Sequence, residues 1–385
     1  MGKQPDSLIL QFVSQAWFGS AADYYEKLPQ YKQGDLLKQL VEHDLEPLGY
    51  YALNEKLPPE YLKDFREKYQ FNSIGSLKTQ VAFAQLCAVF KKNNIRFAPF
   101  KGVDIAKRLF PAAALRSFCD WDVLIHPDDC APALDVLQQN GWKALEKVDL
   151  NTSHYHFAVH TKDNYFLEPH WTFSQFGKVD PRELWEEITP ETCGSVQHVL
   201  SGELNILQLI RHASFNNYSH LPLLKMLQDA AAIIRREKID WQKIRMLAKR
   251  WNLPYPGDIL SVWNEFFPAD VLNAMAGDEH EIARYRKLFA WQDKVDSIAP
   301  GEWALQRHKG GKLAFILQGV SRMTPQALRK KYKLNSRTFY LILPFIYVWD
   351  LTVKFFLYCK YTLFPDKKMK IYQQMCDELE AEREK

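Results

Sequence analysis

Two aspartates one residue apart lie in the segment of this chain that is richest in chemical information. Asp120 and Asp122 belong to the run over residues 115–125, whose apolar pattern predicts a strand entering a packed core. Side chains alternate along a strand, so both carboxylates point to one face, whereas Trp121 and Val123 point to the other. Buried carboxylates are costly without a cation or a donor, and Mg²⁺ prefers such oxygens. A magnesium site is one interpretation, and a solvated strand end is the other.

A third carboxylate lies in an aromatic run further along the chain, over residues 165–171. Glu168 shares a strand face with Phe166 and His170, because these residues are spaced two apart. A glutamate among aromatic residues suits a third metal ligand, or a base that takes a proton from an attacking hydroxyl. A glutamate that faces water on an edge strand gives the same pattern.

Three residues upstream have the chemistry to bind phosphate. Lys101 and Gly102 stand between an expected short strand and an expected helix over residues 103–109. Glycine lets the backbone approach a phosphate, the helix N-terminus favours an anion, and the lysine adds a positive charge. Arg116 could meet a triphosphate, or it could pair with Asp120 or another nearby carboxylate.

The histidines offer a weaker alternative, a zinc site. His154, His156 and His160 recur at even spacing and could share a strand face near His170. No cysteine joins them, and a polar strand face gives the same pattern. The 6 cysteines contain no Cys-x-x-Cys pair, so a reducing cytoplasm is the expected compartment, and the N-terminal residues have no signal-peptide pattern.

The elements that must position these residues alternate between strand and helix in the middle of the chain. We expect helices over residues 76–94 and 127–140, and a hairpin of strands 154–160 and 165–171 around the turn 162–164. The apolar side of the first helix carries Leu77, Val81, Ala84, Leu86, Val89 and Phe90. This order predicts a small mixed α/β unit.

Helical patterns flank the mixed unit on both sides. Residues 1–75 have apolar residues at helical spacing, and the pattern is helical again from Ser201 onward. We therefore expect an α+β chain with three parts: an N-terminal helical region 1–75, an α/β core 76–190 and a C-terminal helical domain 191–385.

Composition narrows the classes of partner. The net charge of +4 on 385 residues does not imply non-specific nucleic-acid binding, and the 47% apolar content supports packed cores. A basic cluster lies within residues 325–337, and an aromatic, amphipathic helix is expected over residues 338–364. A helix buried against the C-terminal domain is the favoured interpretation; the alternative is peripheral contact of residues 325–364 with anionic lipid.

Taken in order, the motifs resemble a known family. Phe100-Lys-Gly-Val-Asp, the strand from Arg116 to Ile125, and Leu167-Glu-Pro-His-Trp resemble the uncharacterised nucleotidyltransferase family of the DNA polymerase beta-like superfamily. The helical stretch over residues 210–241 and Leu363-Phe-Pro-Asp are similar to it as well, so the resemblance touches most of the chain.

The resemblance implies a minimal nucleotidyltransferase core, a mixed sheet with helical regions on both sides. It implies that Asp120, Asp122 and Glu168 hold Mg²⁺, with two ions expected. The implied reaction moves a nucleoside monophosphate from a triphosphate such as ATP to a hydroxyl of a small molecule, a sugar or a glycan precursor. The alternative is a binding or regulatory module that has kept the fold and lost catalysis.

The resemblance also assigns places to the remaining polar residues. Lys101 and Gly102 occupy the position where related enzymes use a Gly-Ser turn to contact phosphates, which is a departure from the usual pattern. His170, together with Arg116 and this turn, is expected at the nucleotide. His212 and Asp229 match recurrent positions, and they could equally pin the helical domain to the core. A cytoplasmic enzyme is expected, with no specific nucleic-acid partner.

Overall fold

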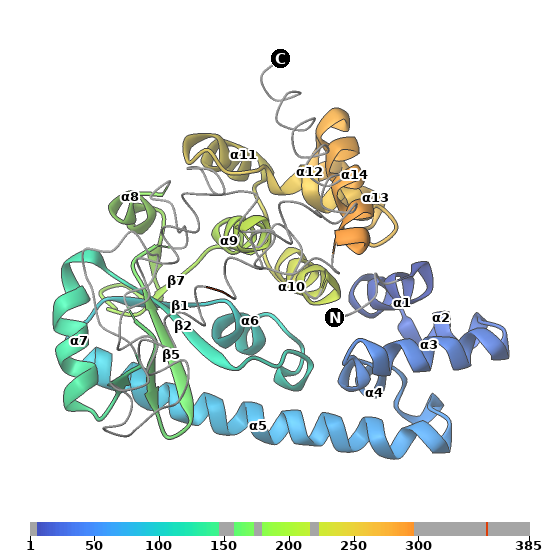
Figure 1. Cartoon of the computed structure of the whole chain (residues 1–385), viewed down its shortest axis with the longest axis horizontal. Helices are drawn as coiled ribbons and strands as arrows, with labels where there is room; N and C mark the ends of the chain where they lie inside the picture. Colours follow the sequence, from blue (N-terminus) through green and yellow to red (C-terminus); the bar gives the residue numbers. More distant parts are fainter. Residues whose placement is uncertain (1–5, 146–157, 173–178, 216–222, 296–351, 353–385) are drawn as a thin grey trace. The chain divides into compact units, whose positions relative to one another are not determined.

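The arrangement of the chain is given by a computed structural model, shown in Figure 1. The described residues are 6–145, 158–172, 179–215, 223–295 and 352. The chain divides into two compact units, Met1–Arg286 and Lys287–Lys385. All of the candidate site residues belong to the first unit.

A five-stranded mixed sheet forms the centre of the α/β part. Its strand order is β1-β2-β5-β4-β3, in which β2 and β5 are parallel and the other pairs are antiparallel. The strands are β1 (Phe97–Phe100), β2 (Asp120–Ile125), β3 (Lys143–Ala144), β4 (His160–Lys162) and β5 (Tyr165–His170). With the helices around it, this sheet confirms the predicted α+β class.

The predicted hairpin is formed by β4 and β5. Its turn holds Asp163 at φ 51° and Asn164 at φ 66°, a left-handed conformation that these two residue types tolerate better than most. The predicted first strand began at residue 154, and its residues 154–157 lie outside the described part of the chain. A second, two-stranded sheet joins β6 (Thr189–Pro190) to β7 (His198–Val199).

One face of the main sheet carries the apolar core. Trp121, Val123 and Ile125 of β2 pack there with Leu167 of β5, as the alternation predicted. They meet the C-terminal end of α5 (Pro59–Lys92) and α7 (Cys130–Gln139). The predicted helix over 127–140 is thus present, with a single 3-10 turn, η3 (Pro127–Asp129), at its start.

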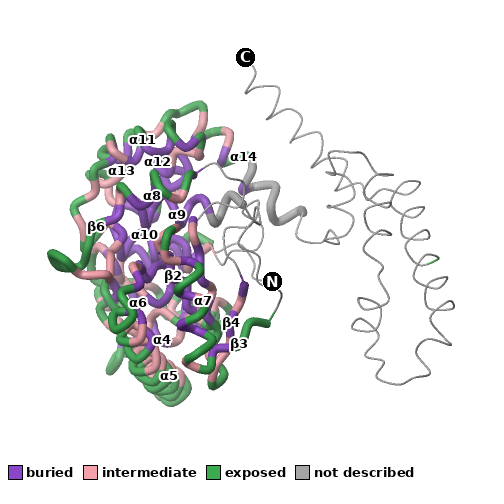
Figure 2. The backbone as a smooth tube through the Cα atoms, turned by 90° about the vertical axis from the view of Figure 1, so that its left-hand side faces the viewer, coloured by how far each residue is buried: buried purple, intermediate pink, exposed green. Residues whose placement is uncertain are grey.

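Helix α5 departs from the predicted burial pattern. It is one continuous helix of 34 residues, and Leu86 and Phe90 near its end are buried as expected. Leu77 and Val81, which were expected on the buried side, are 64% and 54% exposed. The reason is that only the last turns of α5 meet the sheet core, and Figure 2 shows much of the helix as exposed.

The N-terminal part is helical, as predicted. Its first helix contacts the second and third, and the fourth packs along α5, where the buried Phe65 lies. These elements are α1 (Ser7–Phe18), α2 (Ala21–Lys27), α3 (Gln30–Glu42), α4 (Glu46–Leu53) and the 3-10 turn η1 (Asn54–Lys56).

Helix α6 (Gly102–Arg108) contacts β1 and β2, and α10 contacts α6. Helix α10 therefore comes close to the sheet through α6. The remaining elements of this part are η2 (Ala113–Leu115), α8 (Pro181–Glu186), α9 (Gly202–Phe215), α10 (Leu223–Arg236), α11 (Trp241–Arg250), α12 (Pro256–Leu260), η4 (Ser261–Trp263), α13 (Ala269–Met275) and α14 (Glu279–Val295).

The observed helices and strands do not test two of the predictions, the three-part division of the chain and the role of segment 325–364. The three-part division at residues 75 and 190 stays a prediction, and α5 runs continuously through the first boundary. The basic and aromatic segment 325–364 lies almost entirely outside the described residues. In the described part of the chain, no helix combines the length and apolar character that a membrane crossing needs.

Candidate active site

The register of the two parallel strands brings the acidic residues together. Asp122 of β2 lies beside Glu168 of β5, and Asp120 lies beside Phe166. Because side chains two apart on a strand share a face, all three carboxylates lie on the same side of the sheet. That side is opposite the one on which Trp121 packs. Glu168 therefore lies on the sheet face that carries the two aspartates, which a shared metal ion requires.

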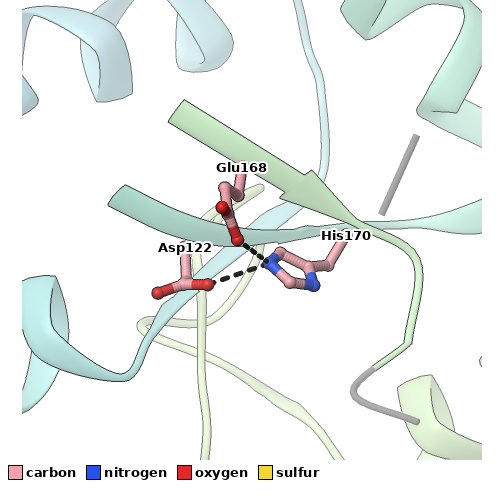
Figure 3. A group of neighbouring side chains, drawn as sticks. All are labelled: Asp122, Glu168 and His170. Carbon is pink, nitrogen blue, oxygen red and sulfur yellow. Dashed lines mark hydrogen bonds and ion pairs between the residues drawn. The ribbon is translucent and has the colours of Figure 1, made fainter. Parts of the chain in front are cut away.

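A buried histidine links two of these carboxylates, as Figure 3 shows. His170 Nε2 lies 2.9 Å from Asp122 Oδ1 and 3.6 Å from Glu168 Oε2. A carboxylate only accepts hydrogen bonds, so Nε2 carries the hydrogen and donates it to Asp122. The ring is fully buried and meets the ring of Phe100 edge-on at a centroid distance of 4.9 Å.

The same three side chains form a possible ligand set. One ligand atom from each of Asp122, Glu168 and His170 lies within 4.8 Å of the others. Carboxylate oxygens suit hard divalent cations, and His170 Nε2 would join them, with metals such as Mn²⁺ or Zn²⁺, once it gives up the hydrogen that it donates to Asp122. Asp120, on the same face, adds a third carboxylate next to this set.

Lys101 lies directly on the acidic cluster. It follows Phe100, which pairs with Asp122 across β1 and β2. Its Nζ donates a hydrogen bond to Asp122 Oδ1 at 2.6 Å. The lysine precedes α6 and has φ 54°, a backbone conformation that glycine adopts far more readily than lysine. A residue of the turn between β1 and α6 thus donates directly to Asp122.

The two aspartates differ in electrostatic environment. Burial alone would raise the pKa of Asp122, but the ammonium of Lys101 and the hydrogen bond from His170 outweigh it and lower that pKa. Proximity to His170 also lowers the pKa of Glu168. The pKa of Asp120 is raised, first by burial and then by the charges of Asp122 and Glu168. The cluster therefore has excess negative charge that a further cation would stabilise.

Gly102 has a packing role in this structure. A Cβ built on it would lie 2.6 Å from Cβ of Phe118, so any larger residue would force the two segments apart. Phe118 precedes β2 by two positions, and this close approach brings the start of α6 next to the start of β2. Phosphate contact by Gly102 stays a prediction.

Arg116 takes one of the alternatives that its sequence left open. Its Nε and Nη2 donate to the two oxygens of Asp229 at 2.6 and 2.8 Å, and both side chains are largely buried. Asp229 belongs to α10 and lies 113 residues away in sequence. The pair pins the C-terminal helices to the segment that leads into β2. Nucleotide binding by Arg116 stays a prediction, and the side chain of His212 lies outside the described part.

Sequence reasoning missed one cation near the site, Lys225 of α10. Its pKa is lowered, first by burial and then by the charge of Arg116, and the charges of Asp229 and Asp120 act against this. Lys225 precedes Asp229 by four residues, so both lie on one helix face. The four-residue spacing would have placed Lys225 near the site only if Asp229 had already been known as the partner of Arg116.

The histidine alternative finds less support. His160 is buried on β4, and its Nδ1 lies 3.0 Å from the carbonyl oxygen of Ala158. Burial lowers its pKa. Residues 154 and 156 lie outside the described part of the chain. Among the described residues, the group of three that could hold a metal contains a single histidine, His170.

Comparison with known proteins adds one finding to this geometry. A family model described as uncharacterised nucleotidyltransferase matches residues 29–256. That range contains the acidic cluster, Lys101, and the pair of Arg116 and Asp229. No curated protein and no solved structure matches the chain.

Proposed function

We propose that this chain, which belongs to the uncharacterised nucleotidyltransferase family, transfers a nucleoside monophosphate from a nucleoside triphosphate to a hydroxyl acceptor. The observation that carries the proposal is the convergence of Asp122, Glu168 and His170, with ligand atoms within 4.8 Å, on the sheet face that also bears Asp120. A purely structural role gives no reason to gather three carboxylates in a half-buried place.

The donor set fits a divalent metal ion. Asp120, Asp122 and Glu168 supply carboxylate oxygens, the ligands that Mg²⁺ takes in proteins while leaving room for phosphate. The environment of Asp120 supports this assignment, because burial and the charges of Asp122 and Glu168 raise its pKa, and a bound cation would stabilise its ionised form. When bound, such an ion neutralises phosphate charge and makes an acceptor hydroxyl easier to deprotonate. Two Mg²⁺ ions are the number that the family resemblance implies.

The residues of the chain itself bind, orient and balance charge. Glu168 has a side chain that is 22% exposed, so it combines contact with the buried His170 and access from solvent. Lys101 contacts Asp122, and Lys225 interacts electrostatically with Asp120, so both add the positive charge that a triphosphate needs. Arg116 fixes α10 against the strand by its pair with Asp229. Catalysis of this kind depends mainly on position and electrostatics.

The acceptor is proposed only as a class: a small molecule, a sugar or a glycan precursor that offers a hydroxyl. The nucleotide is proposed as ATP in the first instance. Cytoplasmic location and peripheral membrane contact through residues 325–364 are likewise proposals. Flotation of the full-length protein with anionic liposomes tests the membrane contact, and failure to float removes it.

Transfer can be tested without knowing the acceptor. The full-length protein is incubated with α-phosphate-labelled triphosphates, Mg²⁺ and a cell extract, and the labelled products are identified by mass analysis. We expect a labelled product with the wild type and none above background with Asp120→Asn or Asp122→Asn. Asp135→Asn on the exposed side of α7 is the matched control and should keep full transfer. Undiminished transfer by either site variant contradicts the proposal.

The second candidate is a binding or regulatory module without catalysis. The ion pair of Lys101 with Asp122 favours it, because an ammonium already neutralises the carboxylate that a metal would use. Thermal denaturation separates the two functions. A catalyst should be stabilised by a triphosphate only with a divalent ion, whereas a module that uses lysine in place of metal should be stabilised equally with or without one.

A further inference from the structure

The ammonium of Lys101 contacts Asp122, a carboxylate that belongs to the possible metal-ligand set. We propose that Lys101 is a displaceable counter-cation: its ammonium competes with a divalent metal ion for Asp122, and moves to the triphosphate when ion and nucleotide bind together. This inference rests on the proposed function and adds to it a residue that couples metal binding to nucleotide binding.

Geometry makes lysine and metal compete. Asp122 Oδ1 accepts from Lys101 Nζ at 2.6 Å and from His170 Nε2 at 2.9 Å, so two donors already meet at one oxygen. The Asp122 side chain is only 4% exposed, which leaves little room around the carboxylate. A bound Mg²⁺ lies about 2.0–2.1 Å from its oxygen ligands. An ammonium in hydrogen-bond contact with the same carboxylate would then repel the ion at close range.

The charge of the lysine reaches the whole cluster. Lys101 Nζ contacts Asp122 Oδ1 at 2.6 Å, and Asp122 lies beside Glu168 on the neighbouring strand and shares its strand face with Asp120, so the ammonium is close to all three carboxylates. One positive charge against three negative charges leaves a deficit, and a divalent ion can replace the lysine with a gain. Lysine is therefore able to hold the cluster together without blocking metal binding permanently.

The backbone indicates that the side chain at position 101 is used. Lys101 has φ 54°, a conformation that disfavours a residue with a Cβ and that glycine would adopt without strain. The side chain is 19% exposed and carries its ammonium on a flexible stem, 5.1 Å from the ring of Phe100. It can leave Asp122 by rotating about its own bonds, without movement of the sheet.

Displacement predicts effects of opposite sign on two ligands. Lys101→Met keeps the length and the contact with Phe100 but removes the charge. We expect the metal ion alone to bind about tenfold more tightly to this variant, because its competitor is gone. We expect the metal–nucleotide complex to bind about tenfold more weakly, because the triphosphate loses a cationic partner. A lysine with a purely structural role would weaken both.

The test uses Mn²⁺ as the probe and the full-length protein. Free Mn²⁺ is followed by its electron paramagnetic resonance signal, with and without a non-hydrolysable ATP analogue. Lys68→Met is the matched control, because Lys68 pairs with Asp44 at 3.3 Å in an exposed position on α5. The control should leave both affinities unchanged. Tighter Mn²⁺ binding together with weaker binding of the Mn²⁺–analogue complex in Lys101→Met supports the proposal.

Other outcomes overturn specific parts. Unchanged or weaker Mn²⁺ binding by Lys101→Met, with wild type binding both ligands, overturns the displacement and leaves the proposed function standing. Absence of Mn²⁺ binding by wild type, with or without the analogue, contradicts the proposed function as well.

If Lys101→Met does not fold, acetylation of Lys101 in the wild-type protein provides the test instead. Mn²⁺ alone should accelerate acetylation of Lys101, whereas the Mn²⁺–analogue complex should slow it, and no change with either overturns the inference.

Discussion

At the scale of single residues, two aspartates with the same strand face have different environments. The sequence presents Asp120 and Asp122 as equivalent, because only the alternation of β2 is visible there. In the fold, Asp122 accepts from Lys101 and His170, whereas Asp120 has a raised pKa at the edge of the cluster. Substitutions at the two positions should therefore affect stability differently, although both should abolish transfer.

The aspartate variants give the first prediction. Asp122→Asn should lower the free energy of unfolding at pH 7 by about 2 kcal/mol, because Lys101 loses a charged partner while keeping some access to water. Asp120→Asn should change it by less than about 1 kcal/mol, or stabilise, because it removes a carboxylate in an unfavourable field. Urea unfolding measures both, and a larger loss in Asp120→Asn would contradict this assignment.

The lowered pKa of Asp122 predicts that the stability of the fold depends on pH. The pKa of Asp122 is lower in the folded than in the unfolded chain. Its ionised form therefore contributes fully to stability at pH values above its pKa in the unfolded chain, which is about 4. That contribution is lost as the pH falls further, through the folded pKa. The gap in unfolding free energy between wild type and Asp122→Asn should therefore narrow below about pH 4. A gap that is constant down to pH 2 would exclude the lowered pKa.

Thiol reactivity gives a second test at this scale. Burial raises the pKa of Cys87 and Cys130 to about 12, so almost no thiolate is present at pH 8. Cys193 is exposed and should react with iodoacetamide much faster. Peptide mass analysis of briefly treated native protein separates the sites. Equal labelling of Cys87 and Cys193 would show that the α5 end is not packed as described.

At the scale of elements, the site depends on a contact that local sequence does not encode. Alternation and turn residues predict β2, and also β5 with the hairpin around Asp163 and Asn164. They do not predict that β5 lies parallel to β2, because the register follows from packing against the core on Trp121 and Leu167. Similarly, the partner of Arg116 lies 113 residues away, so sequence reasoning leaves several carboxylates open.

The close approach of α6 to β2 predicts the effect of a single methyl group. Gly102→Ala should destabilise the protein by about 1–3 kcal/mol, because the new Cβ would meet Phe118 at 2.6 Å. Gly75→Ala is the matched control, since nothing lies within 4 Å of its added Cβ in the middle of α5. The control should stabilise the helix by about 0.5–1 kcal/mol. The melting temperature should fall in Gly102→Ala and rise in Gly75→Ala, relative to wild type. An unchanged melting temperature in Gly102→Ala would contradict the packing role.

The Arg116–Asp229 pair can be measured by a double-mutant cycle. Arg116→Met, Asp229→Asn and the double variant should give a coupling energy of about 1.5–3 kcal/mol, because the contact is bidentate and largely buried. The exposed pair of Lys68 and Asp44 should give less than about 1 kcal/mol. Equal coupling in the two cycles would mean that the buried pair does not anchor α10.

At the scale of the whole molecule, the family match and the site fall in one unit. The match over residues 29–256 and all of the candidate site residues lie within Met1–Arg286. Helicity was predictable over this unit, but which helix faces are covered was not. Leu77 and Val81 have the spacing of a buried stripe and yet are exposed, because burial depends on which elements pack alongside α5.

The central claim is that carboxylates from two neighbouring strands hold a divalent cation. The most direct measurement is anomalous diffraction from crystals of the full-length protein grown with Mn²⁺ and a non-hydrolysable ATP analogue. We predict a manganese peak coordinated by Asp122 and Glu168, with the Lys101 ammonium on the triphosphate. A bound analogue without manganese at these carboxylates, or with Lys101 still on Asp122, would contradict the account.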